Sequence, residues 1–419
     1  MSNKQLIPHL FREEYSKMVA VLCKTFGLTH MELAQDIVSE TFLKATETWG
    51  LKGVPEKPSA WLYTVAKNLA KDHFKRESIF NEKISPELRS VSIEEQLEEI
   101  DLSNENIKDS MLRMMFAVCH PSITRESQIV LSLRVLCGFS IDEIANALLS
   151  NKSNINKRLT RTKKTFRTID FNTSPLSSLH LAKRLHSVLS VLYLLFNEGY
   201  FSSKSSDKIR KDLCYEAMRL LHIVISQKET NLPEANALMA LFCFQASRFD
   251  ARLNQAGEQI LYHEQDAEKW NEELIKKGEY YLFLSGNKKV TRYHLEAMIA
   301  LWHTRKNDDN NHKWDSILQL YNRLLQVQYS PITALNRTYA LAMVKGKEIA
   351  LKEALKIKLD ENPLYHSLLA ELYNGINLEK QISHLKIAIQ LNQNKNDSFV
   401  LEKKLKEASK VHSEKSFNN

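Results

Sequence analysis

Glycine and proline are scarce in this chain, and this scarcity limits its possible folds more than any other property. Only 10 of the 419 residues are glycine and 9 are proline. β-sandwiches and barrels need many tight turns, which these two residues commonly supply. We therefore expect an all-α fold. The length exceeds that of one ordinary domain and predicts two to four domains.

Bulk composition narrows the class of protein. Hydrophobic residues make up 43% of the chain and charged residues 26%, so most of it should fold. The net charge of +8 and the isoelectric point near 9.0 fit a nucleic-acid partner, although a basic balance alone is a weak signal. The N-terminus lacks the apolar core of a signal peptide, and no stretch approaches the ~20 apolar residues of a membrane span.

The cysteines indicate a reducing compartment. They are scattered without CxxC spacing, at Cys23, Cys119, Cys137, Cys214 and Cys243. An odd, unspaced set fits reduced core thiols rather than a disulfide framework or a zinc site. We therefore expect a cytoplasmic protein with no membrane partner, no metal and no cofactor.

Changes of pattern along the chain predict its domains. Residues 6–76 carry apolar residues at the spacing of one helical face, with a break at Gly50–Pro58. Residues 77–110 are acidic with few bases, which predicts a solvated linker. Residues 111–169 form a second helical block that ends in a basic run, and a polar stretch around Asn172–Ser178 predicts a hinge.

The remaining segment, residues 179–412, has a helical pattern with loose repetition. Ser330-Pro331 begins one stretch with small and aromatic residues, and Asn362-Pro363 begins a similar stretch 32 residues later. A period close to ~34 residues is typical of tetratricopeptide-like helix pairs. We expect a helical regulatory domain here.

Residues 140–166 have the pattern of a helix-turn-helix. Ser140 and Glu143 form the sequence signature of a capping box. The first helix would bury Ile141, Ile144, Ala145 and Leu148, and Ser150–Ser153 would form the turn. The second helix would bury Ile155, Leu159, Thr162 and Phe166.

Polar and basic side chains are left on the outer face of this second helix. Those predicted to meet DNA are Lys152, Asn154, Asn156, Lys157, Arg158, Arg161 and Lys164. A recognition helix needs donors for base edges and cations for phosphates. The alternative is a solvated basic helix that binds nothing.

Two strings in the first block carry a family resemblance. Residues 34–49 and 58–76 resemble region 2 of extracytoplasmic-function (ECF) sigma factors, which are bacterial promoter-recognition subunits of RNA polymerase. Residues 111–169 resemble region 4 of the same family. Leu112–Phe116, Val191–Tyr200 and Ala334–Arg337 resemble the subgroup that carries a C-terminal tetratricopeptide-like extension.

The chain departs from this family in two places. Ser39 stands before Glu40 where the family often has glutamine. Lys345-Gly346-Lys347 stands where the extension often has Asp-Gly-Pro, which removes a stiff turn and an acid.

The resemblance implies partners and site residues. Region 2 would bind the clamp helices of core polymerase, and region 4 would bind its flap. The residues implied for the clamp contact are Asp36, Glu40, Phe42 and Lys44. Those implied for the −10 promoter element are Asn68, Lys71, Asp72, Lys75 and Arg76. Region 4 would read the −35 element, and the Gly50–Pro58 break would hold an unstacked base.

Plainer roles remain open for several of these residues. Asp36 and Glu40 lie one turn apart on one helical face, and a lone acidic pair is usually only solvated. Trp61 and Phe74 could stack on bases, but their position on the apolar face favours the core.

The function predicted from these strings is promoter-specific transcription initiation, with the C-terminal domain contacting and regulating the sigma modules in cis. One alternative is a stand-alone helix-turn-helix regulator that binds an operator without polymerase. An enzyme is disfavoured, because His294, Glu296 and His303 lack metalloprotease spacing.

Overall fold

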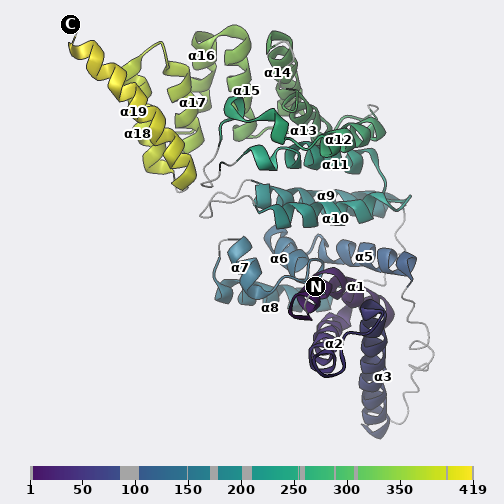
Figure 1. The fold of residues 1–419 in the computed structure, drawn as a ribbon. Helices are drawn as coiled ribbons and strands as arrows, with labels where there is room; N and C mark the ends of the chain where they lie inside the picture. The colour runs from purple at the N-terminus through teal and green to yellow at the C-terminus, as the bar shows by residue number, and fades with distance from the viewer. Residues whose placement is uncertain are drawn as a thin grey trace. The chain divides into compact units, whose positions relative to one another are not determined.

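The regular structure in the described part of this computed structural model is helical (Figure 1). The structure describes residues 3–84, 103–148, 150–169, 178–200, 210–252, 254, 260–286, 289–305, 310–392 and 395–417. No strand occurs among them, so the all-α prediction is confirmed. The chain divides into two units: residues 1–195 with 222–230 form unit 1, and residues 196–221 with 231–419 form unit 2.

Unit 1 holds the two predicted sigma modules. Its helices are α1 (Asn3–Phe26), η1 (Leu28–His30), α2 (Met31–Lys52), α3 (Pro58–Ile84), α5 (Asn104–Val118), α6 (Arg125–Val135), α7 (Ile141–Ala147) and α8 (Lys152–Thr168). Helices α9 (Ser178–Tyr200) and α10 (Lys211–Ile225) contribute residues to both units.

Aromatic packing ties the first three helices together. Trp49 of α2 is almost fully buried, and its ring meets that of Trp61 of α3 edge to face, with centroids 5.3 Å apart. Phe42 of α2 meets Phe11 of α1 in the same way at 4.9 Å. Buried aromatic pairs of this geometry stabilise beyond their buried area. These contacts hold the two region 2 strings on one rigid support.

The break between α2 and α3 is shorter than the sequence predicted. Helix α2 continues through Gly50 to Lys52 and ends at Gly53, whose φ is 83°, so residues 53–57 separate the two helices. A positive φ costs little without a Cβ, so Gly53 ends the helix. Pro58 then begins α3, where the fixed φ of proline suits a first turn.

The acidic linker predicted for residues 77–110 lies largely outside the described residues. Helix α3 extends to Ile84, α5 begins at Asn104, and residues 85–102 are not described. Ser103 caps α5 by accepting a hydrogen bond from the Asn106 amide at 3.2 Å. Helix α5 packs against α1 within unit 1.

Unit 2 consists of helices that pack mostly against their neighbours in sequence. They are α11 (Pro233–Ala246), η2 (Phe249–Ala251), η3 (Tyr262–Glu264), η4 (Ala267–Lys269), α12 (Glu272–Ser285), α13 (Arg292–Trp302), α14 (Asn310–Val327), α15 (Pro331–Lys345), α16 (Lys347–Ile357), α17 (Pro363–Tyr373), α18 (Leu378–Leu391) and α19 (Lys395–Phe417). The two repeat starts predicted from Ser330-Pro331 and Asn362-Pro363 are the starts of α15 and α17.

Close helix crossings distinguish the core of unit 2. Helix α11 is apolar and buried on nearly all sides. Gly278 of α12 lies against the buried Phe244 ring of α11, where a Cβ would come within 2.5 Å of Phe244 Cε1. Further along, Trp314, Leu335, Leu369 and other apolar residues of α14 to α17 form one core cluster. The stack therefore has a continuous apolar interior from α14 to α17.

Candidate nucleic-acid interface

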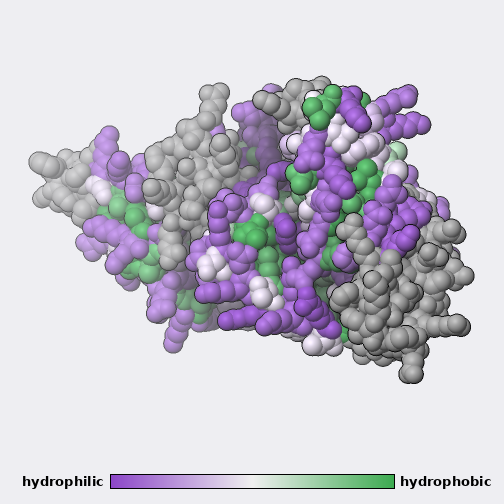
Figure 2. Space-filling view, turned by 90° about the horizontal axis from the view of Figure 1, so that it is seen from below, coloured by the Kyte–Doolittle hydropathy of each residue, from purple (hydrophilic) through white to green (hydrophobic). Residues whose placement is uncertain are grey.

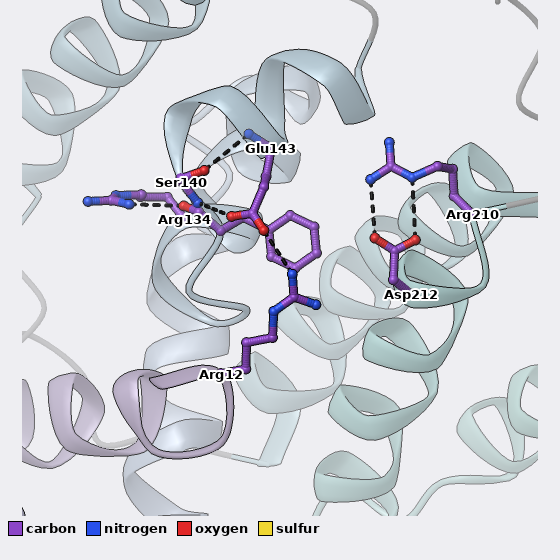
Figure 3. Close-up of polar contacts among 7 residues, drawn as sticks. Arg12, Arg134, Ser140, Glu143, Arg210 and Asp212 are labelled. Carbon is purple, nitrogen blue, oxygen red and sulfur yellow. Dashed lines mark hydrogen bonds and ion pairs between the residues drawn. The ribbon is translucent and has the colours of Figure 1, made fainter. Parts of the chain in front are cut away.

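Helix α7 begins at the predicted capping box. The Glu143 amide donates to Ser140 Oγ at 3.2 Å, and the Ser140 amide donates to Glu143 Oε2 at 2.8 Å (Figure 3). Arg134 of α6 donates to the Phe139 carbonyl at 2.9 Å, which fixes the chain just before the cap. The short helix therefore starts at a defined residue and angle.

Helix α8 buries the four residues that the sequence predicted: Ile155, Leu159, Thr162 and Phe166. It begins at Lys152 rather than after Ser153, because the Asn151 side chain caps it by accepting from the Asn154 amide at 2.8 Å. The helix packs against α6 and α7. Its outer face is thereby fixed relative to α7.

The polar residues predicted to meet DNA lie on that outer face. Those with exposed side chains are Lys152, Asn154, Asn156, Lys157, Arg158, Arg161 and Lys164. Helix α8 carries no acidic residue. Lys152 lies 2.7 Å from Asp142 of α7, across the turn. The rest of this face offers cations and amide donors, as phosphate and base-edge contacts require.

Helix α2 presents an acidic and apolar face. Asp36 and Glu40 are exposed, and Lys44 lies 3.3 Å from Glu40. Phe42 is only 5% exposed and belongs to the core, so its side chain supports the helix rather than reaching a partner. The exposed apolar residues of α2 are instead Leu43 and Leu51, which are 58% and 88% exposed.

Leu51 was not singled out from the sequence. It follows the buried Trp49 near the end of α2, where an apolar side chain fits either the core or a partner surface. Only its exposure separates these two roles.

Helix α3 exposes most of the residues predicted for the −10 element. Asn68, Asp72 and Lys75 are exposed and Lys71 is half-buried, whereas the side chain of Arg76 lies outside the described residues. The Phe74 side chain is likewise not described. Trp61 is half-buried against Trp49, which places it in the packing between α2 and α3.

Helix α3 is also tied to α1 by a hydrogen bond. Tyr63 Oη donates to Glu14 Oε2 at 2.7 Å, and Glu14 is buried. Burial, together with the hydrogen bond and the negative charge of Glu14, raises the pKa of Tyr63. The phenol therefore stays protonated and keeps α3 in register with α1.

Ion pairs join the two predicted modules within unit 1, which the sequence pattern did not reveal. Glu32, in the first turn of α2, lies 3.1 Å from Lys163 and also pairs with Arg167, both on α8. Arg12 of α1 pairs with Glu143 at 2.9 Å (Figure 3). Each partner is more than 130 residues from the other along the chain, so no local spacing rule connects them.

Groups of both modules influence the pKa of Lys163. Burial and the Arg134 guanidinium lower its pKa, while the carboxylate of Asp36 raises it. Asp36, a residue predicted to face polymerase, therefore lies near a cation of α8. Tyr15 of α1 is buried at the same junction, and Gly138 of the α6–α7 loop lies against its ring.

Hydrophobic side chains appear only as small patches among hydrophilic ones on the face shown in Figure 2. No helix of the described residues is long and apolar enough to span a membrane. Among the described residues, no three histidine, cysteine or carboxylate side chains group as metal ligands would. His294 instead lies buried in the cap of α13, with Nδ1 2.9 Å from Thr291 Oγ1.

Known proteins match this chain in two segments and over most of its length. Residues 11–79 match the sigma-70 region 2 family, and residues 184–285 match a family of unknown function, DUF6596. An uncharacterized protein of Rhizobium meliloti (strain 1021) is 30% identical over 343 residues, which is 81% of each chain. No solved structure matches the chain.

The chain is all-helical in the part that the structure describes, and its N-terminal region 2 module supports the role of an RNA polymerase sigma factor. The chain belongs to the same family as the uncharacterized Rhizobium meliloti protein. Its sigma-70 region 2 domain supports a sigma factor of the sigma-70 family. Members of this family initiate transcription without catalysing a reaction themselves, and region 2 implies contact with core polymerase and promoter DNA.

Proposed function

We propose that this protein is an ECF-type sigma factor that acts in the cytoplasm and directs promoter-specific initiation. The observation that carries the proposal is the region 2 match at residues 11–79, where α2 and α3 expose polar faces on a shared core. The region 2 match also argues against a stand-alone operator-binding regulator, because such a regulator does not need a module that binds core polymerase.

The acidic face of α2 is proposed to bind the clamp helices of core polymerase. Asp36 and Glu40 are exposed one turn apart, so both can meet basic side chains of one partner surface. Leu43, exposed beside them, would add an apolar contact. Lys44 lies at the edge of this face and would orient Glu40 through their ion pair.

Promoter contacts are proposed for α3 and α8. Asn68 and Asp72 of α3 can bond the edges of unpaired bases at the −10 element, while Lys71, Lys75 and Arg76 would hold the backbone. The N-terminal turns of α8 would enter the major groove of the −35 element as region 4, which would also contact the polymerase flap.

The C-terminal helices are proposed to form a tetratricopeptide-like domain that modulates the sigma modules in cis. Prolines begin α15 and α17, and successive helices pack on one another, as repeat helices do. Lys347, where the family resemblance would have proline, donates from Nζ to the Asn374 carbonyl at 3.1 Å and lies 3.5 Å from Glu371. This loop is thus tied to α17 by a lysine.

A run-off transcription assay tests the central proposal. Core polymerase, the full-length protein and a library of promoter fragments should yield specific transcripts. Asp36→Ala with Glu40→Ala should abolish them, whereas Glu105→Ala, which removes an exposed acid in the first turn of α5, should not. A protein that shifts duplex DNA but never binds core polymerase would instead be a stand-alone regulator.

The regulatory role of the C-terminal domain needs a separate comparison. A chain ending after Thr230 keeps every residue of unit 1. Circular dichroism should first show that the shortened chain is folded and helical. If its transcript yield and promoter choice then equal those of the full chain, the C-terminal domain does not regulate in cis.

A further inference from the structure

Two arginines of unit 2 lie against one buried tyrosine. Arg248 and Arg252 flank the short helix η2, and Tyr200 is the last residue of α9. Arg248 donates from Nη2 to Tyr200 Oη at 3.5 Å, and the Arg252 guanidinium lies over the Tyr200 ring, with Cζ 4.1 Å from the centroid. Arg252 also donates from Nη1 to the Tyr200 carbonyl at 3.3 Å. Two like charges are therefore held beside the same residue.

A second tyrosine extends this group of cations. Arg248 Cζ lies 5.4 Å from the ring centroid of Tyr262 in η3, and Lys313 Nζ of α14 lies 5.1 Å from it. Lys313 is only 2% exposed and donates to Tyr262 Oη at 2.8 Å and to the Arg305 carbonyl at 2.7 Å. We call this group the basic cluster; it consists of Tyr200, Arg248, Arg252, Tyr262 and Lys313.

Neither arginine is paired with a carboxylate in the part of the chain that the structure describes. Asp250, which lies between them in the sequence, instead pairs with Lys211 of α10 at 2.5 Å. Both arginines are half-buried, so each remains in contact with solvent and a small ion can reach it. A partly buried cation loses hydration that a neighbouring anion would replace. The charges of Arg248 and Arg252 therefore favour an anion from outside the chain.

Two buried nitrogen atoms of this region have no hydrogen-bond partner among the described residues. They are Arg248 Nε and His303 Nδ1. His303 lies beside Tyr262, with ring centroids 5.1 Å apart. Arg248 stays charged at neutral pH, so a buried N–H of its guanidinium is costly to leave without an acceptor. An external acceptor would satisfy it.

The electrostatic environment of the basic cluster favours negative charge. Burial by itself raises the pKa of the Tyr200 phenol, but the charges of Arg252 and Arg248 bring this pKa below its ordinary value. Burial, followed by the charges of Arg248 and Lys313, lowers the pKa of His303 to about 3, so its imidazole stays neutral. A group that becomes negative is stabilised here and one that becomes positive is not, as an anion site requires.

We propose that the basic cluster binds a phosphate group, either as inorganic phosphate or as part of a small phosphorylated molecule. A phosphate monoester carries about −1.5 to −2 charges at pH 7 and has several acceptor oxygens. Guanidinium groups match such oxygens with donors in a planar fork. A single carboxylate would balance only one of the two arginines. The site goes beyond the proposed sigma function, since binding needs neither polymerase nor DNA.

A bound phosphate should hold together separate segments of unit 2. Tyr200 ends α9, Arg248 and Arg252 flank η2, Tyr262 begins η3, and Lys313 lies in the first turn of α14. An ion that binds only the folded state stabilises it by mass action. Phosphate should therefore raise the melting temperature of the full-length protein, and more so as its concentration rises.

Calorimetric titration and thermal melts of the full-length protein, in a buffer without phosphate, test binding. Inorganic phosphate should bind and raise the melting temperature, whereas chloride at equal ionic strength and acetate should not. Glycerol phosphate and adenosine monophosphate, compared with glycerol and adenosine, show whether a phosphorylated molecule is preferred to the free ion. If no phosphate compound binds at up to about 10 mM, where even a millimolar Kd would be detected, the proposal is overturned.

Arginine variants and a matched control locate the site. Arg248→Gln and Arg252→Gln should each weaken phosphate binding at least about tenfold, because each removes a charged donor. Arg252→Lys, which keeps the charge but not the planar fork, should weaken it less but measurably. The control is Arg292→Gln on α13, since Arg292 also lies over a tyrosine ring, that of Tyr293 at 5.0 Å, but has Glu296 3.8 Å away. It should bind phosphate like the wild type.

Melting temperatures without phosphate separate binding from a purely structural role. Removal of one of two neighbouring positive charges should leave the ligand-free melting temperature unchanged or raise it, and should remove only the increase that phosphate causes. A glutamine variant that melts lower yet keeps the wild-type affinity would show that the arginines serve packing, and the proposal would fail. Equal weakening by Arg292→Gln would overturn it as well.

Circular dichroism shows whether each variant is folded. If a glutamine variant does not fold, Arg252→Lys and the wild-type comparison of anions decide, and unchanged affinity in Arg252→Lys overturns the site. None of these measurements involves polymerase. Failure to bind phosphate therefore leaves the sigma function untouched, and a protein that directs no transcription can still bind phosphate.

Discussion

Two helical glycines have opposite surroundings. Gly50 of α2 is exposed, and a Cβ there would meet nothing within 4 Å. Gly278 of α12 is buried, and a Cβ there would overlap the ring of Phe244. The same residue type therefore reduces stability at one site and permits a close helix crossing at the other.

Substitution of each glycine by alanine should have opposite effects. Gly278→Ala should lower the unfolding free energy by about 1–3 kcal/mol, because the Phe244 ring must move within a packed core. Gly50→Ala should raise it by about 0.5–1 kcal/mol, because alanine favours the helix. Calorimetry of the full-length variants measures both, and stabilisation by Gly278→Ala would contradict the crossing described here.

Two half-buried histidines, His303 and His384, link stability to pH. Burial, with Arg248 and Lys313 nearby, lowers the pKa of His303 to about 3. Burial, with His366 and Lys380, also lowers the pKa of His384, whose Nδ1 lies 3.0 Å from Nδ1 of His366. In the unfolded chain each group titrates near its ordinary pKa of about 6.5.

The unfolding free energy should fall as pH decreases below about 6.5. The unfolded chain takes up protons there while the folded histidines remain neutral, so each such group removes up to about 1.4 kcal/mol per pH unit until its folded pKa is reached. His303→Gln should flatten this slope down to about pH 3. His263→Gln, at an exposed position, is the control in the same urea titrations and should leave the slope close to that of the wild type.

At the scale of elements, α2 and α8 show one apolar face each and opposite charges on their outer faces. Ile155 and Phe166 bury one face of α8, while Arg158 and Arg161 remain outside. On α2, Trp49 and Phe42 face the core, and Asp36 faces out. Each helix thus combines a stabilising side with a side available to a partner.

Substitutions along α8 should separate affinity from sequence preference. Arg161→Ala should weaken promoter binding similarly for all sequences and reduce the slope of log affinity against log salt by about 1. Asn154→Ala should change base preference at one position and leave the salt slope unchanged. Arg113→Ala on α5, an exposed arginine paired with Asp109, serves as control, and the test is holoenzyme binding to promoter DNA at several salt concentrations.

At the scale of the whole molecule, the compact unit that holds the predicted sigma modules extends past the stretch where the sequence suggested a hinge. Unit 1 continues through α9 to Leu195 and takes in residues 222–230 of the α10 region. Leu185, Val188 and Leu189 of α9 are fully buried. The polar stretch at Asn172–Ser178, which predicted the boundary, is largely outside the described residues.

A chain cut after Ser174 should therefore be less stable than the full-length protein. The cut removes α9, and with it buried apolar residues that belong to unit 1. We expect a lower melting temperature and more aggregation than for a chain ending after Thr230. Equal melting temperatures for the two truncated chains would show that α9 contributes little to unit 1.

Local sequence signals predicted much of the helical framework because they act within a few residues. The capping box at Ser140 and Glu143, the buried positions of α8 and the proline starts of α15 and α17 all follow from neighbours along the chain. The same signals indicated the exposed residues of α8 and, on α3, Asn68, Asp72 and Lys75, whereas Lys71 is half-buried. They failed at Gly50, because glycine permits a break but does not require one.

The amino-acid sequence by itself determined the all-α class, the helix-turn-helix and the two charged helices offered to partners. Only the tertiary structure decided that Phe42 is core, that Leu51 is exposed and that Glu32 meets Lys163 and Arg167. Helical periodicity states which side of a helix is apolar, but not which distant element covers it. That choice depends on packing between residues more than 130 positions apart, for which the sequence carries no local signal.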